Sequence, residues 1–303
     1  MAGGETRWHN ENVRRVWLLT LLCGCVGPGL LTDGSSVSVG TFTHGLLRHG
    51  ARLAPKGEGY WIQPLWAARN SNYGTDELVE ALQHVARRVH REYPGALLQI
   101  GDLSTKGGGD SVLHRSHENG RDADLIYYAV DGQGKPAPPA ESMPRYGADL
   151  QARAPAPPEH GVVFGPFSPR SFDVARNWAL VRALLEEPRV EVQYLFINEV
   201  LKQTLLEWAR AHGEDPALVD RADALLHQPG DSAPHDDHLH VRIFCSTDDR
   251  PYGCSDRGPI RWWKKRYKYM PPIVSRATLD QLAGAMAQLV GAGRAWRLRG
   301  FVP

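Results

Sequence analysis

Cysteine, excess charge of one sign and long apolar runs are all scarce in this sequence. Its 303 residues include four cysteines, and 35 basic against 34 acidic residues leave a net charge of +1. This balance provides no global field to attract nucleic acid or a membrane surface. Cys23 and Cys25 lie in a candidate targeting segment, which excludes a four-cysteine zinc site. Cys245 and Cys254 flank a turn-rich loop and can form a local disulfide in an oxidising compartment.

The N-terminal residues 1–25 have the layout of a signal or lipoprotein-type targeting segment. Arg14 and Arg15 precede a short apolar run at 16–22, which is too short for a permanent membrane anchor, and no later run is long enough to cross a bilayer. Cys25 imperfectly matches the lipidated cysteine of bacterial lipoproteins, and a soluble secreted product is the alternative. We expect a periplasmic protein, attached to the outer membrane only through a lipid on Cys25.

Frequent glycine (31) and proline (22) indicate many turns and argue against a helical bundle. Strands and helices do not alternate regularly, and no nucleotide-type glycine fingerprint follows a strand. We predict an α+β fold with a small, mostly antiparallel central sheet flanked by helices. Residues 26–59 are expected to be a loose lead-in, and 60–303 a single domain with an extended proline-rich surface insertion at about 131–160. Spacing and capping residues predict helices at about 75–92, 173–186, 199–211, 216–227 and 277–291, and strands at 96–100, 122–130 and 190–198.

Two histidine-rich clusters carry the candidate chemistry. In "HDDHLHVRIFC" (235–245), His238 and His240 lie two apart in a predicted strand and therefore share one face. Both can bind a metal, or one can bind it while the other acts on what the metal activates; two solvated strand histidines are the alternative. In "HRSHENGRDAD" (114–124), His117 and Asp124 flank a tight turn that can bring them together. Two histidines and a carboxylate, with a fourth position left to water, form a common catalytic zinc set, whereas a polar loop with charge pairs is the plainer interpretation.

These motifs, in this order, carry a family resemblance. The pattern HxxHxxGxDxD is present as His114, His117, Gly120, Asp122 and Asp124, and HxxHxHVR is present as "HDDHLHVR" (235–242). Together with "YGTDELVEAL", "IGDLSTKGGG" and "FINEVLKQTLL", they span roughly residues 60 to 250. The sequence resembles the penicillin-insensitive murein endopeptidases, within the lysostaphin, D-Ala-D-Ala metallopeptidase and hedgehog superfamily.

The resemblance implies a zinc ion bound by His117, Asp124 and His240. It implies that His238 acts beside the metal as general base or stabiliser of the tetrahedral intermediate, with His235 and His114 orienting substrate or handling protons. Some family members bind a second metal through the histidine matching His114, so His114 is also a candidate metal ligand. His160 and Asp173 are possible further contributors to that second metal.

The activity implied by the resemblance is zinc-dependent hydrolysis of the bond between D-alanine and meso-diaminopimelate in peptidoglycan stem peptides. A D-Ala-D-Ala carboxypeptidase of the same superfamily and a non-catalytic, zinc-containing cell-wall-binding module are the alternatives. The segment "RWWKKRYKYMPP" (261–272) has a composition found in nucleic-acid binders. We expect no nucleic-acid partner, because an exported hydrolase has no access to one.

Three further residues have alternative interpretations. Glu118 is a competing general base, but as the neighbour of a ligand on a turn it is expected to point away. Arg242 can hold a substrate carboxylate, although a structural salt bridge is the preferred interpretation. Asp102 can orient a ligand histidine, and capping of a turn is preferred for it.

Overall fold

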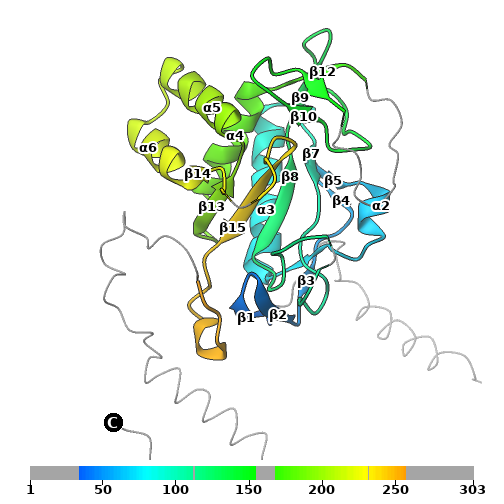
Figure 1. Cartoon of the computed structure of the whole chain (residues 1–303), viewed down its shortest axis with the longest axis vertical. Helices are drawn as coiled ribbons and strands as arrows, with labels where there is room; N and C mark the ends of the chain where they lie inside the picture. The colour runs from blue at the N-terminus through cyan, green and yellow to red at the C-terminus, as the bar shows by residue number, and fades with distance from the viewer. Residues whose placement is uncertain (1–33, 112, 155–167, 231, 257–303) are drawn as a thin grey trace, which may run out of the picture.

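The computed structural model describes residues 34–111, 113–154, 168–230 and 232–256 (Figure 1). Its centre is a seven-stranded mixed sheet. In spatial order the strands are β14 (Leu226–His227), β13 (Val192–Phe196), β15 (His238–Ile243), β8 (Asp122–Ile126), β7 (Leu98–Ile100), β5 (Tyr60–Ile62) and β4 (Lys56–Gly57). The α+β prediction is confirmed. Two strand pairs, β5 with β7 and β13 with β14, are parallel, which the sequence pattern of the individual strands did not reveal. Each parallel pair is joined by a helical crossover, as parallel pairing requires.

The helices follow the predicted amphipathic segments. The first crossover contains α2 (Pro64–Ala67) and α3 (Asp76–Glu92), and the second contains α5 (Glu199–Ala211) and α6 (Pro216–Leu225), while α4 (Val174–Leu185) precedes β13. In Figure 1, α3 passes behind the central sheet, and α4, α5 and α6 gather beside β13 and β14. Buried positions of α3 recur at helical spacing, from Leu78 through Leu82 and Val85 to Val89, so this face covers the sheet. Among the described residues, no helix is long and apolar enough to cross a membrane.

The expected loose lead-in is wrong for the described residues from 34 onwards. Strands β1 (Val37–Thr41) and β2 (His44–Arg48) form an antiparallel hairpin, and β3 (Ala51–Arg52) pairs with β6 (Tyr73–Gly74). The Ser36 hydroxyl accepts a hydrogen bond from the backbone N–H of Asp76 at the start of α3. Partners distant in sequence therefore hold this segment, which its serine- and glycine-rich composition could not indicate.

The hairpin is also fixed by the disulfide loop near the end of the described chain. Cys245 and Cys254 form the predicted disulfide, and the loop between them contains a short 3-10 helix, η1 (Arg250–Tyr252). The N–H of Gly40 in β1 donates to the carbonyl of Gly253 at 3.1 Å, and the N–H of Ser38 donates to the Asp249 carboxylate, also at 3.1 Å. The loop therefore connects β1 to β15.

The proline-rich segment is less detached than predicted. Its described part carries β10 (Arg145–Tyr146) and β11 (Ala152–Arg153), and β9 (Ala129–Asp131) pairs with β12 (Arg170–Phe172). The side chain of Gln99, in central strand β7, donates to the carbonyl of Ala140 at 2.7 Å and accepts from its N–H at 2.9 Å. Tyr146 is buried in the core. The extended-insertion prediction is therefore wrong for residues 131–154. The predicted targeting segment, segment 261–272, helix 277–291 and His160 lie outside the described residues.

Candidate metal and catalytic site

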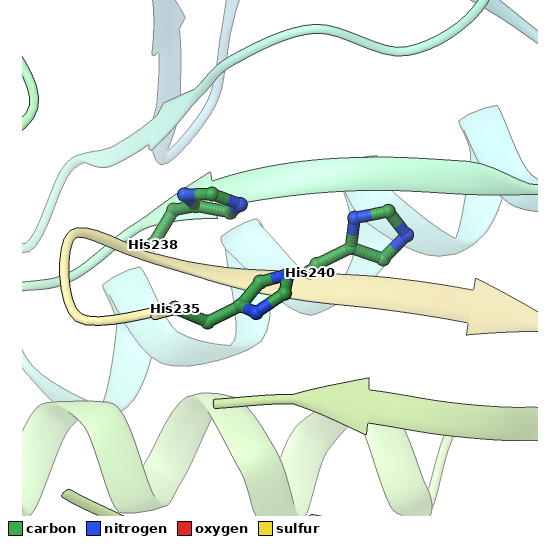
Figure 2. Close-up of side chains that lie close together, drawn as sticks. All are labelled: His235, His238 and His240. Atoms are coloured by element: carbon green, nitrogen blue, oxygen red, sulfur yellow. The ribbon is translucent and has the colours of Figure 1, made fainter. Parts of the chain in front are cut away.

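The site lies where β8 and β15 run side by side in the central sheet. Their antiparallel register places Asp124 directly opposite His240. His238 and His240 lie on one face of β15, as predicted, and His235 turns its ring towards the space between them from the preceding turn (Figure 2). The His235 ring centroid lies 5.1 Å from that of His238 and 5.9 Å from that of His240, closer than these two are to each other (6.5 Å).

Three imidazoles converge on a single carboxylate oxygen. Oδ1 of Asp124 lies 3.1 Å from Nδ1 of His240 and 3.4 Å from Nε2 of both His117 and His238. His117 enters from the loop before β8 with a positive φ of 70°, and Gly120, with φ of 79°, completes the turn between His117 and Asp124. The structure thus brings together the predicted ligand set of His117, Asp124 and His240, with His238 beside it.

The hydrogen bonds of His117 and His240, the two predicted ligand histidines, define which ring nitrogen of each faces the centre. Nδ1 of His117 lies 3.2 Å from the carbonyl oxygen of Leu103, and Nε2 of His240 lies 2.8 Å from Oδ1 of Asp122. Both oxygens only accept, so each of these nitrogens carries the proton and, in a neutral ring, the other nitrogen presents a lone pair to Asp124. Metal-binding histidines are oriented by outer acceptors in this way.

This arrangement is electrostatically incomplete without a cation. Nε2 of His117 and both carboxylate oxygens of Asp124 are buried and have no hydrogen-bond partner within the described part of the chain. Lone pairs that face a carboxylate repel one another, and buried polar atoms are rarely left unpaired. A set of two nitrogens and one carboxylate oxygen is one that zinc accepts, so these residues fit such an ion.

His238 and His235 have opposite electrostatic environments. Burial opposes protonation of His238, but Asp124 and Asp237 outweigh it and raise its pKa to about 9. Asp237 Oδ1 lies 2.6 Å from His238 Nδ1, which holds the ring with Nε2 towards the centre. Burial, together with the two neighbouring histidines, lowers the pKa of His235 to about 3. With no cation at the centre, His238 is therefore protonated at neutral pH, whereas His235 is neutral.

His114 and Asp102 form an adjoining pair. Nδ1 of His114 lies 3.9 Å from Oδ2 of Asp124, and the structure groups His114, His117 and Asp124 as a set able to hold a metal. Oδ2 of Asp102 lies 3.0 Å from Nε2 of His114 and accepts from Arg69 at the same distance. The interpretation of Asp102 as a turn cap is wrong, because its carboxylate orients His114.

Two residues considered from sequence point away from the centre. Oε2 of Glu118 accepts from the N–H of Gly45 in β2 at 3.0 Å, as expected for a residue that points away. Asp173 caps α4 through the N–H of Arg176 and does not join the site.

The orienting role of Asp122 could not be read from the sequence. Oδ1 of Asp122 accepts from Nε of Arg242 at 2.6 Å as well as from His240, so the preferred salt bridge of Arg242 is confirmed. The Arg242 guanidinium also stacks 3.4 Å from the ring centre of Phe42, in the turn between β1 and β2. Asp122 stands in the HxxHxxGxDxD motif, but only the strand register shows what its side chain contacts.

The sequence is similar to those of known murein endopeptidases. The family model described as penicillin-insensitive murein endopeptidase matches residues 38–262. A penicillin-insensitive murein endopeptidase of Haemophilus influenzae is 26% identical over 229 residues, which cover 75% of this chain and 70% of the relative. Proteins of the same name from Klebsiella pneumoniae (26% over 227 residues; 75% of this chain, 72% of the relative) and Salmonella arizonae (26% over 216 residues; 71% and 69%) are similar to it as well.

Proposed function

The chain belongs to the penicillin-insensitive murein endopeptidase family, and from this premise we propose that it is a zinc-dependent peptidase of the cell wall. The proposed substrate is cross-linked peptidoglycan, and the proposed bond is the amide between D-alanine and meso-diaminopimelate of two stem peptides. The observation that carries the proposal is the convergence of three imidazole nitrogens on Oδ1 of Asp124. Nε2 of His117 and both Asp124 carboxylate oxygens are buried and have no hydrogen-bond partner among the described residues.

His117, Asp124 and His240 would hold one zinc ion. When bound, zinc supplies a Lewis acid that activates water for attack and polarises the carbonyl of the scissile amide. A dication beside Nε2 of His238 favours the neutral ring, which can then accept the proton of the attacking water. Asp237 holds that ring in place through Nδ1. His238 then returns the proton to the nitrogen of the departing amine.

His235 and His114 border this centre and are assigned to substrate. His235 has a buried Nδ1 without a hydrogen-bond partner among the described residues, available to a substrate group. His114 is fixed through Nε2 by Asp102. We assign one metal to the Oδ1 side of Asp124, which the three converging histidines face, whereas His114 faces Oδ2 at 3.9 Å.

The proposal is tested on defined, cross-linked muropeptide dimers, with product masses and bound zinc measured for each protein. We expect the purified protein to convert dimers to monomers and a chelator to abolish this. His238→Ala should lose cleavage by at least about 100-fold while it retains zinc, the usual scale of a lost general base. His240→Ala should lose zinc, and replacement of the exposed His212, which follows α5, by alanine serves as the matched control. Bound zinc without cleavage of any dimer would favour the binding module, and absence of zinc would refute the metal assignment.

The same proposal includes export to the periplasm, with Cys25 as the site of lipid attachment. The disulfide of Cys245 and Cys254 agrees with an oxidising compartment. Cell fractionation, with lipid labelling of the wild-type chain and of Cys25→Ala, measures both parts. Recovery of label in Cys25→Ala would refute the lipid assignment, and cytoplasmic recovery of the wild-type chain would refute export.

A further inference from the structure

The turn that presents His235 and His238 is held by an arginine from the proline-rich segment. Nε and Nη2 of Arg145, in β10, donate to the carboxylate of Asp236 at 2.7 to 3.0 Å. The N–H of the neighbouring Tyr146 donates to the backbone carbonyl of Asp236 at 2.8 Å. Asp236 lies between His235 and the Asp237 that binds His238. The guanidinium is therefore attached directly to the turn that carries the proton-handling histidine.

Within the described part of the chain, three arginines pair with carboxylates at or next to the site, and the partner of Arg145, Asp236, lies on the turn that carries His238. Arg242 is buried, with its side chain 4% exposed and stacked on Phe42. Arg69 is 37% exposed, but it binds Asp102 on the side of His114. Arg145 is 35% exposed, and its Nη1 has no hydrogen-bond partner among the described residues.

The proposed reaction requires a cation at this position. The nitrogen that leaves in D-alanyl–diaminopimelate hydrolysis is bonded to a carbon that also bears a carboxylate. That nitrogen must come within hydrogen-bond reach of the group that protonates it, His238, so the adjacent carboxylate lies on the same side of the centre. Asp236 and Asp237 would repel this carboxylate unless a donor of opposite charge faced it.

We propose that Arg145 binds the substrate carboxylate adjacent to the leaving nitrogen and thereby selects for diaminopimelate with that carboxylate free. Asp236 holds the guanidinium through Nε and Nη2, which leaves Nη1 to donate to the substrate carboxylate. A planar, fixed guanidinium suits a carboxylate better than a mobile ammonium does. The inference rests on the proposed function, whose substrate it specifies.

Two muropeptide dimers that differ only in this group, a carboxylate or a carboxamide, test the proposal. We expect the zinc-loaded protein to cleave the carboxylate dimer with a kcat/KM about 10- to 100-fold higher, the range of one hydrogen bond between charged groups. Arg145→Gln should lose most of this preference, because kcat/KM should fall further for the carboxylate dimer than for the carboxamide dimer, so that the ratio of the two approaches one. Arg153→Gln is the matched control, because Arg153 faces Arg145 across β10 and β11 but pairs with Asp149 at the surface.

The outcomes separate the inference from the function on which it rests. An equal loss on both dimers in Arg145→Gln would mean that the arginine only supports the turn, and the inference would be overturned. Equal cleavage of both dimers by the wild-type protein would also overturn it while leaving the endopeptidase intact. Cleavage of neither dimer by the zinc-loaded wild type would refute the proposed function itself. Zinc content and thermal unfolding, measured for every variant, identify a misfolded protein.

Discussion

Replacement of Asp122 by asparagine should weaken both the fold and the metal site. Asp122 is fully buried, and its Oδ1 accepts hydrogen bonds from Nε2 of His240 at 2.8 Å and from Nε of Arg242 at 2.6 Å. Burial opposes its charge, but Arg242 and His240 outweigh it and hold the pKa of Asp122 far below its ordinary value. The carboxylate is therefore ionised at neutral pH, and asparagine removes a charge on which two partners depend.

The loss of stability can be estimated from the buried arginine that the substitution leaves unpaired. The Arg242 guanidinium stays buried without its anion, and breaking a buried ion pair costs about 3–5 kcal/mol. The Phe42 ring, 3.4 Å from the guanidinium, contacts Arg242 before and after the substitution, so this contact cancels in the comparison. We expect a loss of about 3–5 kcal/mol in the free energy of unfolding. Zinc affinity should fall about 10- to 100-fold, the usual effect of losing an outer partner of a ligand histidine.

Two measurements on the same variants separate these effects. Denaturant unfolding of the metal-free protein measures stability, and competition with a zinc-binding dye measures affinity. Adding Arg242→Met to Asp122→Asn removes the unpaired charge, so it should recover about 1–3 kcal/mol of stability. It should not recover zinc affinity, because His240 still lacks its carboxylate. The exposed Asp248→Asn is the matched control and should change stability by less than about 0.5 kcal/mol.

The reasoning would be refuted by an Asp122→Asn protein whose stability and zinc affinity both match the wild type. Recovery of zinc affinity in the double variant would refute the orienting role alone, because it would mean that the unpaired arginine, and not the histidine, had disturbed the site.

Three further predictions concern the scaffold. Replacing Cys245 and Cys254 by serine should lower the free energy of unfolding, measured in denaturant, by about 2–3 kcal/mol, the loop-closure value for a separation of nine residues. An unchanged unfolding midpoint would contradict this prediction. Gly120→Ala should lower the melting temperature more than Gly213→Ala does. Both glycines have a positive φ, but only at Gly120 would the new Cβ meet Leu47 atoms, at 2.7 Å. Equal losses of melting temperature in the two variants would exclude a role for this clash. Burial opposes ionisation of Glu187, but its histidine and arginine partners hold its pKa below the ordinary value. The stability this adds is complete above the unfolded-state pKa and is lost as pH falls through the folded-state pKa. Glu187→Gln should therefore cost about 1–3 kcal/mol at pH 7 and progressively less as the pH falls into the acid range; a cost independent of pH would contradict the assignment.

Several features followed from sequence because short-range interactions produce them. The spacing of Leu78, Leu82 and Val85 defines an apolar face within one helix. The His-x-His pair shares a face through the two-residue period of a strand. The disulfide closes a short loop. Each of these depends on residues close together along the chain.

Other features were predicted wrongly, or could not be predicted from the sequence, because they depend on contacts between residues distant in sequence. The seven-stranded sheet is mixed because helical crossovers join very short strands, such as β5 and β14, that show no periodicity of their own. Gln99 holds the proline-rich segment, and the disulfide loop holds the β1–β2 hairpin, through backbone groups that composition does not reveal.

In the candidate site, too, some features follow from the sequence and others from the tertiary structure. Sequence alone determined which residue types stand at His117, Asp124, His238 and His240, and the motif spacing sufficed to recognise their family. Only the tertiary structure decided that β8 and β15 pair with Asp124 opposite His240 and that Asp122 orients His240. Strand register and side-chain direction are set by packing across the whole sheet, and the convergence of buried lone pairs on one carboxylate exists only once that packing is complete.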